Sequence, residues 1–252
     1  MNIIRIQATD STNRYLKKLS DGDPHLPEGT TLVASVQTAG RGQAGNGWEA
    51  EAGKNLTFSV LLYPHLLSAR RHFLLSEAVA LAVVEALETL KQPLKMDARV
   101  KWPNDIYVGD RKMAGILIEN DWQGDHIRRS IVGIGLNVNQ LEFTSDAPNP
   151  ISIKQITGAD TDLDALLGEI LQHIYKVYKQ LDDCRGGDLS RPIVAQMYAE
   201  KLYRKTGFFD FADKNGIFRA EIQSVSDDGR LHLATADGEL RAYAFKEVAF
   251  RT

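Results

Sequence analysis

The chain has 252 residues, of which 43% are hydrophobic and 25% are charged, so it can bury a full core in one large domain with a small second one. Its 30 Lys and Arg against 33 Asp and Glu give a net charge of -3, which excludes a global electrostatic attraction to nucleic acid or to an anionic membrane. The single cysteine excludes an internal disulfide, and the first residues lack the charged and apolar regions of a secretory signal, so we expect a cytoplasmic location.

The first predicted elements are a helix and two strands. Asp10 precedes "STNRYLKKL" as a candidate N-cap, because its carboxylate can accept hydrogen bonds from the free amides of the first helical turn. β-rich stretches at 30–37 and 55–63 predict two strands on either side of a glycine-rich segment. That segment is therefore predicted to be a loop that joins two strands.

A long helix is predicted between residues 69 and 91, where apolar residues recur at helical spacing and Pro93 ends the pattern. Its longest apolar stretch is interrupted by Ser76, Glu77 and Glu85, which indicates a core helix and not a membrane span. We expect this helix to pack across the sheet.

Three further strands are predicted at 99–102, 113–121 and 129–139, and the last two are nearly continuous apolar runs of the buried-sheet type. The helical pattern returns at 163–181 and again after Ser190.

Near the C-terminus the pattern changes to short strands separated by "DDG" at 227–229 and "ADG" at 236–238, which predict tight turns. We place a domain boundary near Thr206. This gives a larger unit of residues 1–206 and a small β unit of residues 207–252.

The stretch "QTAGRGQAGNGW", residues 37–48, is the first that could carry chemistry. It holds four glycines around Arg41 and closes on Trp48, so it is costly to order unless a ligand compensates. A plain surface hairpin is the simpler alternative, but such loops usually need one or two glycines. Its amides can approach an anion, the arginine can pair with a carboxylate or phosphate, and the tryptophan offers a flat face to a ring. The stretch matches neither the P-loop nor the dinucleotide fingerprint.

A second motif is "KWPNDIYVGDRKMAGILIE", residues 101–119, in which Pro103 fixes a bend directly after a strand and holds Lys101 and Asn104 beside it. For an isolated lysine, an exposed strand edge would be the better interpretation, with "PND" as a polar turn.

Two more motifs have equally simple alternatives. In "GIGLNVN", residues 133–139, Gly133 and Gly135 allow close approach to the backbone, and Asn137 is polar in an apolar strand, although filling of the core explains each residue alone. The motif "DSTN", residues 10–13, begins a helix, where capping and ligand contact are compatible.

These four motifs, in this order and followed by a small β unit, resemble the catalytic region of biotin protein ligases over nearly the whole chain. The resemblance implies that biotin and ATP form biotinyl-5′-adenylate and pyrophosphate, and that biotin then passes to a lysine of a biotin carboxyl carrier protein domain. It also implies an α+β fold, in which a mixed sheet is flanked by helices as in class II aminoacyl-tRNA synthetases. A C-terminal SH3-like barrel would complete that fold.

The resemblance also implies roles for individual residues. The catalytic residues would be Lys101 and Arg41. Biotin would be bound by Ser11, Thr12, Asn13, Gln37, Gly40, Arg41, Gly42, Gln43, Lys101 and Gly115. ATP would be bound by Arg41, Trp48, Asn104, Lys112 and Asn137. The loop departs from the family at Gln43, Ala44 and Asn46, where basic residues can occur, so fewer cations would face the phosphates.

The implied chemistry needs fixed positive charge, because a carboxylate and a triphosphate repel each other. Arg41 and Lys101 can supply that charge without a protein nucleophile, and Mg²⁺ would offset the remaining phosphate charge, with no protein side chain assigned to the metal. The glycine-rich loop would then order over biotin and the adenylate and shield the mixed anhydride from water.

Three alternatives remain open at this point. A lipoate ligase shares the fold and the adenylation step, but its glycine-rich motif has consecutive glycines near a histidine, which this chain lacks. A lipoyl or octanoyl transferase would need a cysteine nucleophile, and Cys184 lies among acidic residues that disfavour a thiolate. A transcriptional regulator would need a helix-turn-helix before Asp10, so no nucleic-acid partner is expected. The sequence leaves open whether the chain forms a homodimer.

Overall fold

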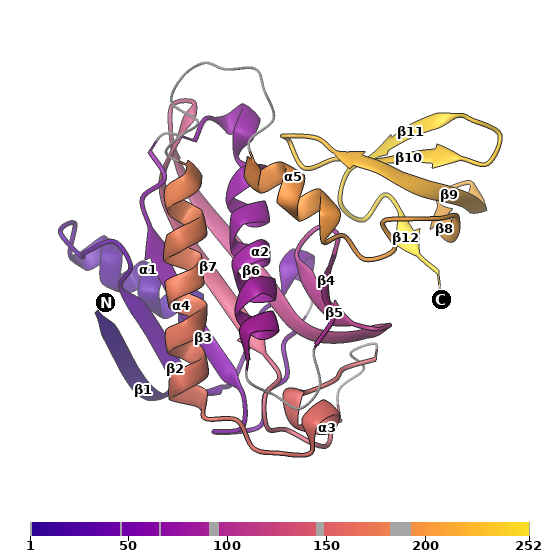
Figure 1. The fold of residues 1–252 in the computed structure, drawn as a ribbon. Coiled ribbons are helices and arrows are strands. Elements are labelled where there is room, and N and C mark those ends of the chain that lie inside the picture. Colours follow the sequence, from indigo (N-terminus) through magenta and orange to yellow (C-terminus); the bar gives the residue numbers. More distant parts are fainter. Residues whose placement is uncertain are drawn as a thin grey trace.

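The computed structural model describes residues 2–45, 47–65, 67–90, 96–144, 149–181 and 193–251, without the side chain of Ala44. The predictions that involve Pro93, Asn46 and Cys184 therefore lie outside the described residues. Figure 1 shows a large mixed sheet covered by helices, with a smaller sheet at the C-terminal end of the chain.

The large sheet has seven strands in the order β1-β2-β3-β7-β6-β5-β4. In that order the strands are Ile3–Thr9, Thr31–Gln37, Leu56–Leu62, His126–Leu136, Arg111–Gln123, Asp105–Val108 and Ala98–Lys101. The β1–β2 pair is parallel and every other pair is antiparallel, which makes the sheet mixed. The predicted mixed sheet is confirmed, and the glycine-rich loop joins β2 to β3 as expected.

Helices cover both faces of this sheet, which explains why all seven residues of β3 are buried. On one face, α1 (Thr12–Gly22) places Leu16 against Leu32, Leu61 and Ile131. On the other face α2 (Phe73–Thr89) and α4 (Leu163–Gln180) lie side by side and pack against each other (Figure 1). The remaining helices are α3 (Ile153–Thr157) and α5 (Ile193–Glu200).

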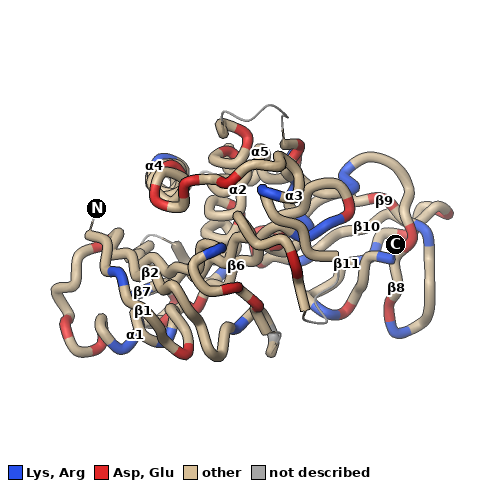
Figure 2. The backbone as a smooth tube through the Cα atoms, turned by 90° about the horizontal axis from the view of Figure 1, so that it is seen from below, with Lys and Arg blue, Asp and Glu red and all other residues tan. Residues whose placement is uncertain are grey.

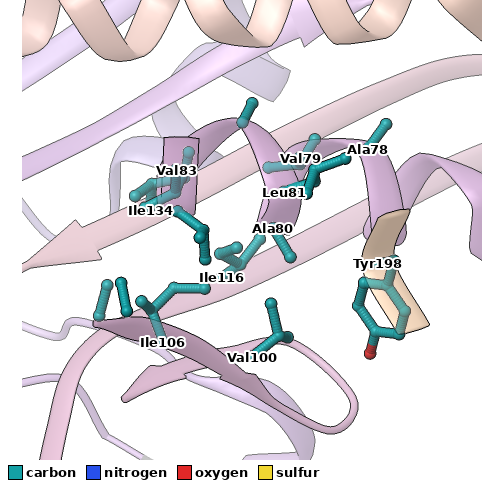
Figure 3. Packing of buried hydrophobic residues seen from close by; sticks show 14 of the residues in the cluster. Ala78, Val79, Ala80, Leu81, Val83, Val100, Ile106, Ile116, Ile134 and Tyr198 are labelled. Carbon is teal, nitrogen blue, oxygen red and sulfur yellow. The ribbon is translucent and has the colours of Figure 1, made fainter. Parts of the chain in front are cut away.

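The central helix α2 is apolar on all sides, and 13 of its 17 residues are buried. A helix of this kind is stable only when it is enclosed on every side. Figure 3 shows its side chains packed against residues from four strands of the large sheet and one residue of α5: Val100, Ile106, Ile116, Ile134 and Tyr198. Among the described residues, no helix is long and apolar enough to cross a membrane.

The small sheet has five strands in the order β11-β10-β9-β8-β12. These strands are Leu240–Tyr243, Leu231–Thr235, Gly216–Val225, Phe209–Asp213 and Ala249–Phe250. The turns predicted at 227–229 and 236–238 are present, and Gly229 and Gly238 have φ values of 86° and 89°, which favour glycine. Within the described residues no strand pairing joins β11 to β12, so the sheet is open and a closed SH3-like barrel is not shown.

The two sheets share one hydrophobic core. The indole Nε1 of Trp102 donates to the carbonyl of Gly229 at 2.9 Å. A Cβ atom at Gly229 would lie 2.6 Å from a ring carbon of Phe73, so the turn approaches α2 more closely than a residue with a side chain would allow. The small sheet is thus docked firmly on the large one.

Two local predictions need correction. Ser11, and not Asp10, occupies the N-cap position of α1, and the carboxylate of Asp10 instead accepts from the backbone N–H of Ser11 at 2.7 Å. The helix predicted from residue 69 begins at Phe73, because Ala69–Arg71 forms a 3₁₀ turn before it.

A charged cluster fixes the C-terminal part of α1 to the hairpin between β6 and β7. Asp121 accepts from Lys17 Nζ at 2.8 Å and from Arg129 Nε at 2.9 Å. The side chain of Arg129 is only 5% exposed and also donates to Asp21 at 2.7 Å. Burial raises the pKa of Asp121, but the hydrogen bonds from Lys17 and Arg129 outweigh this effect and hold the pKa below 3.8.

This cluster predicts a pH-dependent stability. Because the folded-state pKa of Asp121 is depressed, its stabilising effect is present above pH 3.8, the ordinary value, and is lost as pH falls through the folded-state pKa. The variant Asp121→Asn should therefore lose stability at about pH 7 and show a shallower decline toward about pH 3. Urea unfolding of both proteins over that range measures the difference. Parallel curves for the two proteins would contradict the prediction.

Candidate functional site

All of the predicted site residues line one cavity of about 880 Å³. They come from the start of α1, the end of β2, the β2–β3 loop, the end of β4 and the turn after it, strand β6 and the residues after β7. They are Ser11, Thr12, Asn13, Gln37, Gly40, Arg41, Gly42, Gln43, Trp48, Lys101, Asn104, Lys112, Gly115 and Asn137. The fold thus brings together motifs that lie far apart in the sequence.

One end of the cavity is a buried polar network at the start of α1. The backbone N–H and the hydroxyl of Thr12 donate to Gln37 Oε1 at 2.8 and 3.1 Å. Asn13 Nδ2 donates to Glu119 Oε2 at 2.8 Å, and the hydroxyl of Ser59 lies 2.6 Å from Asn13 Oδ1. Ser11, Thr12 and Asn13 are at most 4% exposed. Buried polar groups need such partners, so the network holds the side chains of Thr12, Asn13 and Gln37 in defined orientations.

The middle of the cavity is a flat surface of glycines. Gly115 of β6 pairs with Gly135 of β7, and the ring of Trp48 lies against both. A Cβ atom at Gly135 would lie 2.2 Å from Trp48 Cε2, and one at Gly133 would lie 2.2 Å from Asn13 Oδ1. The predicted close approach at the two β7 glycines is confirmed, and the groups that approach are side chains of the protein.

Two buried polar atoms of the cavity wall have no hydrogen-bond partner within the described part of the chain. They are Trp48 Nε1, a donor, and Gln43 Oε1, an acceptor. Since leaving a buried polar atom unpaired costs about 1–3 kcal/mol, these atoms are suited to pair with a ligand.

Other polar residues of the cavity are held by backbone contacts. Asn104 Nδ2 donates to the carbonyl of Ile116 at 2.6 Å, and Asn137 Nδ2 donates to the carbonyl of Ile151 at 3.3 Å. The amide oxygen of each side chain takes no part in these two hydrogen bonds. Both residues are at most 6% exposed.

Three cationic side chains line the cavity, and they differ in their partners. Arg41 Nη2 lies 2.8 Å from Glu119 Oε1 and 3.0 Å from Oε2, while Lys112 Nζ lies 2.7 Å from Asp105 Oδ1. Across the described ranges, no carboxylate lies within 4.0 Å of Lys101 Nζ. Among the described residues, Lys101 is therefore the cation of this cavity that has no carboxylate within ion-pair distance.

Lys101 has aromatic neighbours in place of a carboxylate. Its Nζ donates to the hydroxyl of Tyr107 at 3.2 Å and lies 4.6 Å from the centre of that ring and 5.4 Å from the ring of Phe250. Burial lowers the pKa of Lys101, and Lys112 and Arg204 add to this effect against the opposing influence of Asp105. A bound anion would favour the charged ammonium and reverse part of this shift.

Several residues of the cavity were not predicted. Tyr107 lines the cavity, and Glu119 lies outside its lining but pairs with Arg41. Both belong to the motif at 101–119, but nothing in their spacing indicates that they contact Lys101 and Arg41. The C-terminal sheet contributes Phe245, Val248, Ala249 and Phe250, which depend on the docking of the two sheets and leave no local sequence signal. In the described part of the chain, no group of three or more His, Cys, Asp and Glu side chains is placed to hold a metal ion.

Comparisons with known proteins agree with this arrangement. A family model described as the Biotin/lipoate A/B protein ligase family matches residues 5–137. The biotin--[acetyl-CoA-carboxylase] ligase of Paracoccus denitrificans is 32% identical over 236 residues, which are 89% of this chain and 91% of that protein. The bifunctional ligase/repressor BirA of Bacillus spizizenii is 29% identical over 248 residues, which are 96% of this chain and 72% of that protein.

The same relation appears among solved structures. Biotin protein ligase from Aquifex aeolicus, in complex with biotin and ATP, superposes with a TM-score of 0.78 at 28% identity, over 99% of this chain and 98% of that chain. The biotin complex of the R40G mutant of that ligase gives a TM-score of 0.76 at 27% identity, over 100% of this chain and 98% of that chain. Fold, sequence and cavity lead to one conclusion: the chain belongs to the biotin/lipoate A/B protein ligase family.

Proposed function

We propose that this chain is a biotin protein ligase, which activates biotin with ATP and transfers it to a lysine of a carboxyl carrier domain. The observation that carries the proposal is the cavity. It combines a lysine, Lys101, that has no carboxylate within 4.0 Å among the described residues with two buried polar atoms, on Trp48 and Gln43, that have no partner there. The ligases of Paracoccus denitrificans and Aquifex aeolicus support the same activity over nearly the whole chain.

In the first step a carboxylate oxygen of biotin attacks the α-phosphorus of ATP, the bond to the bridging oxygen breaks, and pyrophosphate leaves. We assign Lys101 and Arg41 as the catalytic residues, because positive charge fixed at the reacting oxygens stabilises the negative charge that accumulates there. The exposed ion pair between Arg41 and Glu119 is weak, so an anionic ligand can compete for the guanidinium. Transfer to the carrier lysine then releases AMP.

The two ends of the cavity suit the two substrates. The network of Thr12, Asn13 and Gln37, with Ser11 beside it in the cavity wall, offers donors and acceptors in fixed orientations. A ring system with a polar edge, such as biotin, requires such groups. Trp48 offers a flat face to the nucleotide, and Lys112 offers a cation whose Nζ lies 5.9 Å from the centre of the Trp48 ring. Asn104 and Asn137 line the same cavity. Mg²⁺ would enter with the phosphates of ATP and offset their charge.

Further parts of the proposal concern organisation and partners. We assign residues 1–206 to a catalytic domain and 207–252 to an SH3-like domain. The short strands and tight turns of the second sheet support the latter assignment. Figure 2 shows Lys and Arg interspersed with Asp and Glu along the chain, which together with the net charge of -3 argues against a nucleic-acid partner.

The proposal is tested by incubating the protein with MgATP, a biotin carboxyl carrier domain and either biotin or lipoate. With biotin, we expect the intact mass of the carrier to rise by one biotinyl group and pyrophosphate to be released. With lipoate, we expect neither change. A carrier whose acceptor lysine is replaced by arginine is the control and should stay unmodified. Lipoylation without biotinylation would overturn the assignment and identify a lipoate ligase.

The glycine-rich loop gives a prediction on ligand binding. Arg41 is 40% exposed in its side chain and is flanked by Gly40 and Gly42, so trypsin can cleave after it. When biotin and ATP are both present, the anionic partners of the loop are in place and we expect cleavage at this bond to slow. The measurement is the rate at which the corresponding fragments appear, with each ligand alone as the control. Equal rates under all conditions would count against ordering of the loop.

A further inference from the structure

We infer that Phe250, in the C-terminal sheet, is a positioning residue for Lys101 and thereby makes that sheet a part of the adenylation site. This inference rests on the proposed function, since it concerns the step in which Lys101 meets the biotin carboxylate and ATP. The ring of Phe250 lines the cavity, and its centre lies 5.4 Å from Lys101 Nζ. That distance is within the range of a cation–π interaction.

The ring of Phe250 is itself held in place by the core of the small sheet. Phe250 of β12 pairs in register with Phe211 of β8, whose side chain is fully buried, and the two ring centres lie 5.0 Å apart. Tyr203 joins this group, with its ring centre 6.0 Å from Phe250 and 5.4 Å from Tyr107. Tyr203 thus connects the two rings that face Lys101, Tyr107 of the large sheet and Phe250 of the small sheet.

The aromatic surroundings explain how Lys101 can be positioned and still act on an anion. Arg41 and Lys112 are each oriented by a carboxylate, which neutralises part of their charge. An aromatic face attracts an ammonium through its quadrupole and carries no net charge, so it orients the cation without replacing the anionic ligand. Lys101 is held by Tyr107 and Phe250 and keeps its charge available to the substrates.

The alternative is that Phe250 only fills the core of the small sheet. Phe218 of β9 offers a matched control, because its ring also stacks on Phe211, at 6.1 Å, but lies outside the cavity. A core-filling role predicts the same result for substitutions at both positions. A positioning role predicts a loss of activity at Phe250 alone.

The experiment measures pyrophosphate release from biotin and MgATP by the full chain, without a carrier domain. Phe250→Leu keeps apolar volume and removes the aromatic face, and we expect kcat/KM to fall about fivefold, as for the loss of about 1 kcal/mol. Phe250→Tyr restores the face and should restore most of the activity. Phe218→Leu should stay within about twofold of the wild type.

A second measurement separates an effect through Lys101 from a general one. In a Lys101→Gln background the cation is absent, so adding Phe250→Leu should change the residual rate by less than about twofold. Where Phe250→Leu fails to fold, Phe250→Met serves in its place, because methionine is a flexible apolar residue without an aromatic face.

The outcomes distinguish the two proposals. A wild-type protein that releases no pyrophosphate with biotin and MgATP overturns the proposed function. An active wild type with an equally active Phe250→Leu variant overturns the positioning role alone. Equal losses in the Phe250→Leu and Phe218→Leu variants, or a similar loss with and without Lys101, would also overturn it and assign Phe250 to the core.

Discussion

Lys101→Gln is expected to lower pyrophosphate release from biotin and MgATP by about a hundredfold or more, which corresponds to about 3 kcal/mol. Glutamine keeps most of the side-chain length and some hydrogen-bonding capacity but removes the positive charge. The effect is large because no carboxylate among the described residues pairs with this ammonium within 4.0 Å, so its charge is available to an anion in the cavity. The assay omits the carrier domain, which isolates adenylation from transfer.

The matched control for this variant is Lys18→Gln, because Lys18 is exposed on α1 and does not line the cavity. We expect the control to keep its activity and both variants to keep their stability within about 0.5 kcal/mol of the wild type. If the folded Lys101→Gln protein releases pyrophosphate within about threefold of the wild type, its catalytic role must be withdrawn. Lys101 would then be a strand-edge lysine.

Gly135→Ala is expected to raise the KM for ATP about tenfold or more. The new Cβ atom would lie 2.2 Å from the ring of Trp48, so the ring must leave the flat surface that Gly115 and Gly135 provide. Overpacking of this kind costs roughly 1–3 kcal/mol, and the displaced indole can no longer offer its face or its Nε1 to the nucleotide. Initial rates over a range of ATP concentrations, at saturating biotin, give the measurement.

Gly168→Ala is the control for this change. Gly168 lies inside α4, and a Cβ atom there would meet nothing within 4 Å. This variant should bind ATP normally and gain about 0.5–1 kcal/mol of stability, because alanine loses less backbone entropy in a helix. A Gly135→Ala protein whose KM for ATP stays within about twofold of the wild type would show that the Trp48 ring has no part in nucleotide binding.

Much of the fold could be predicted because long apolar patterns have clear periods. The buried strands at 113–121 and 129–139 and the helix at 163–181 are confirmed by β6, β7 and α4. Strand β1 was missed because its pattern of partly buried and exposed residues is weak, and β5 was missed because it has only four residues directly after the turn at Pro103. Whether such a short or weakly patterned segment forms a strand depends on its pairing with a neighbouring strand, which the local sequence does not show.

The gathering of the predicted site residues in one cavity could be foreseen from the four motifs, although the role of each residue remains to be tested. The contacts between the motifs could not be foreseen. Arg41 and Glu119 lie 78 positions apart, and only the order of strands in the sheet makes them neighbours. The same holds for Phe250, which reaches Lys101 through the docking of two sheets. The SH3-like barrel, which rested on the resemblance alone, is an open sheet in the described residues.

The contact of Gly229 with Phe73 and Trp102 makes a gap between the two sheets an unfavourable entrance to the cavity. Access through a gap between the two sheets would break the bond from the Trp102 indole and expose apolar side chains, at roughly 1.5–3 kcal/mol for each. Access past the β2–β3 loop separates the exposed pair of Arg41 and Glu119, which costs about 0–1 kcal/mol. We therefore expect substrates to arrive and products to leave past the loop, so that opening of this one segment would limit how fast the adenylate is lost.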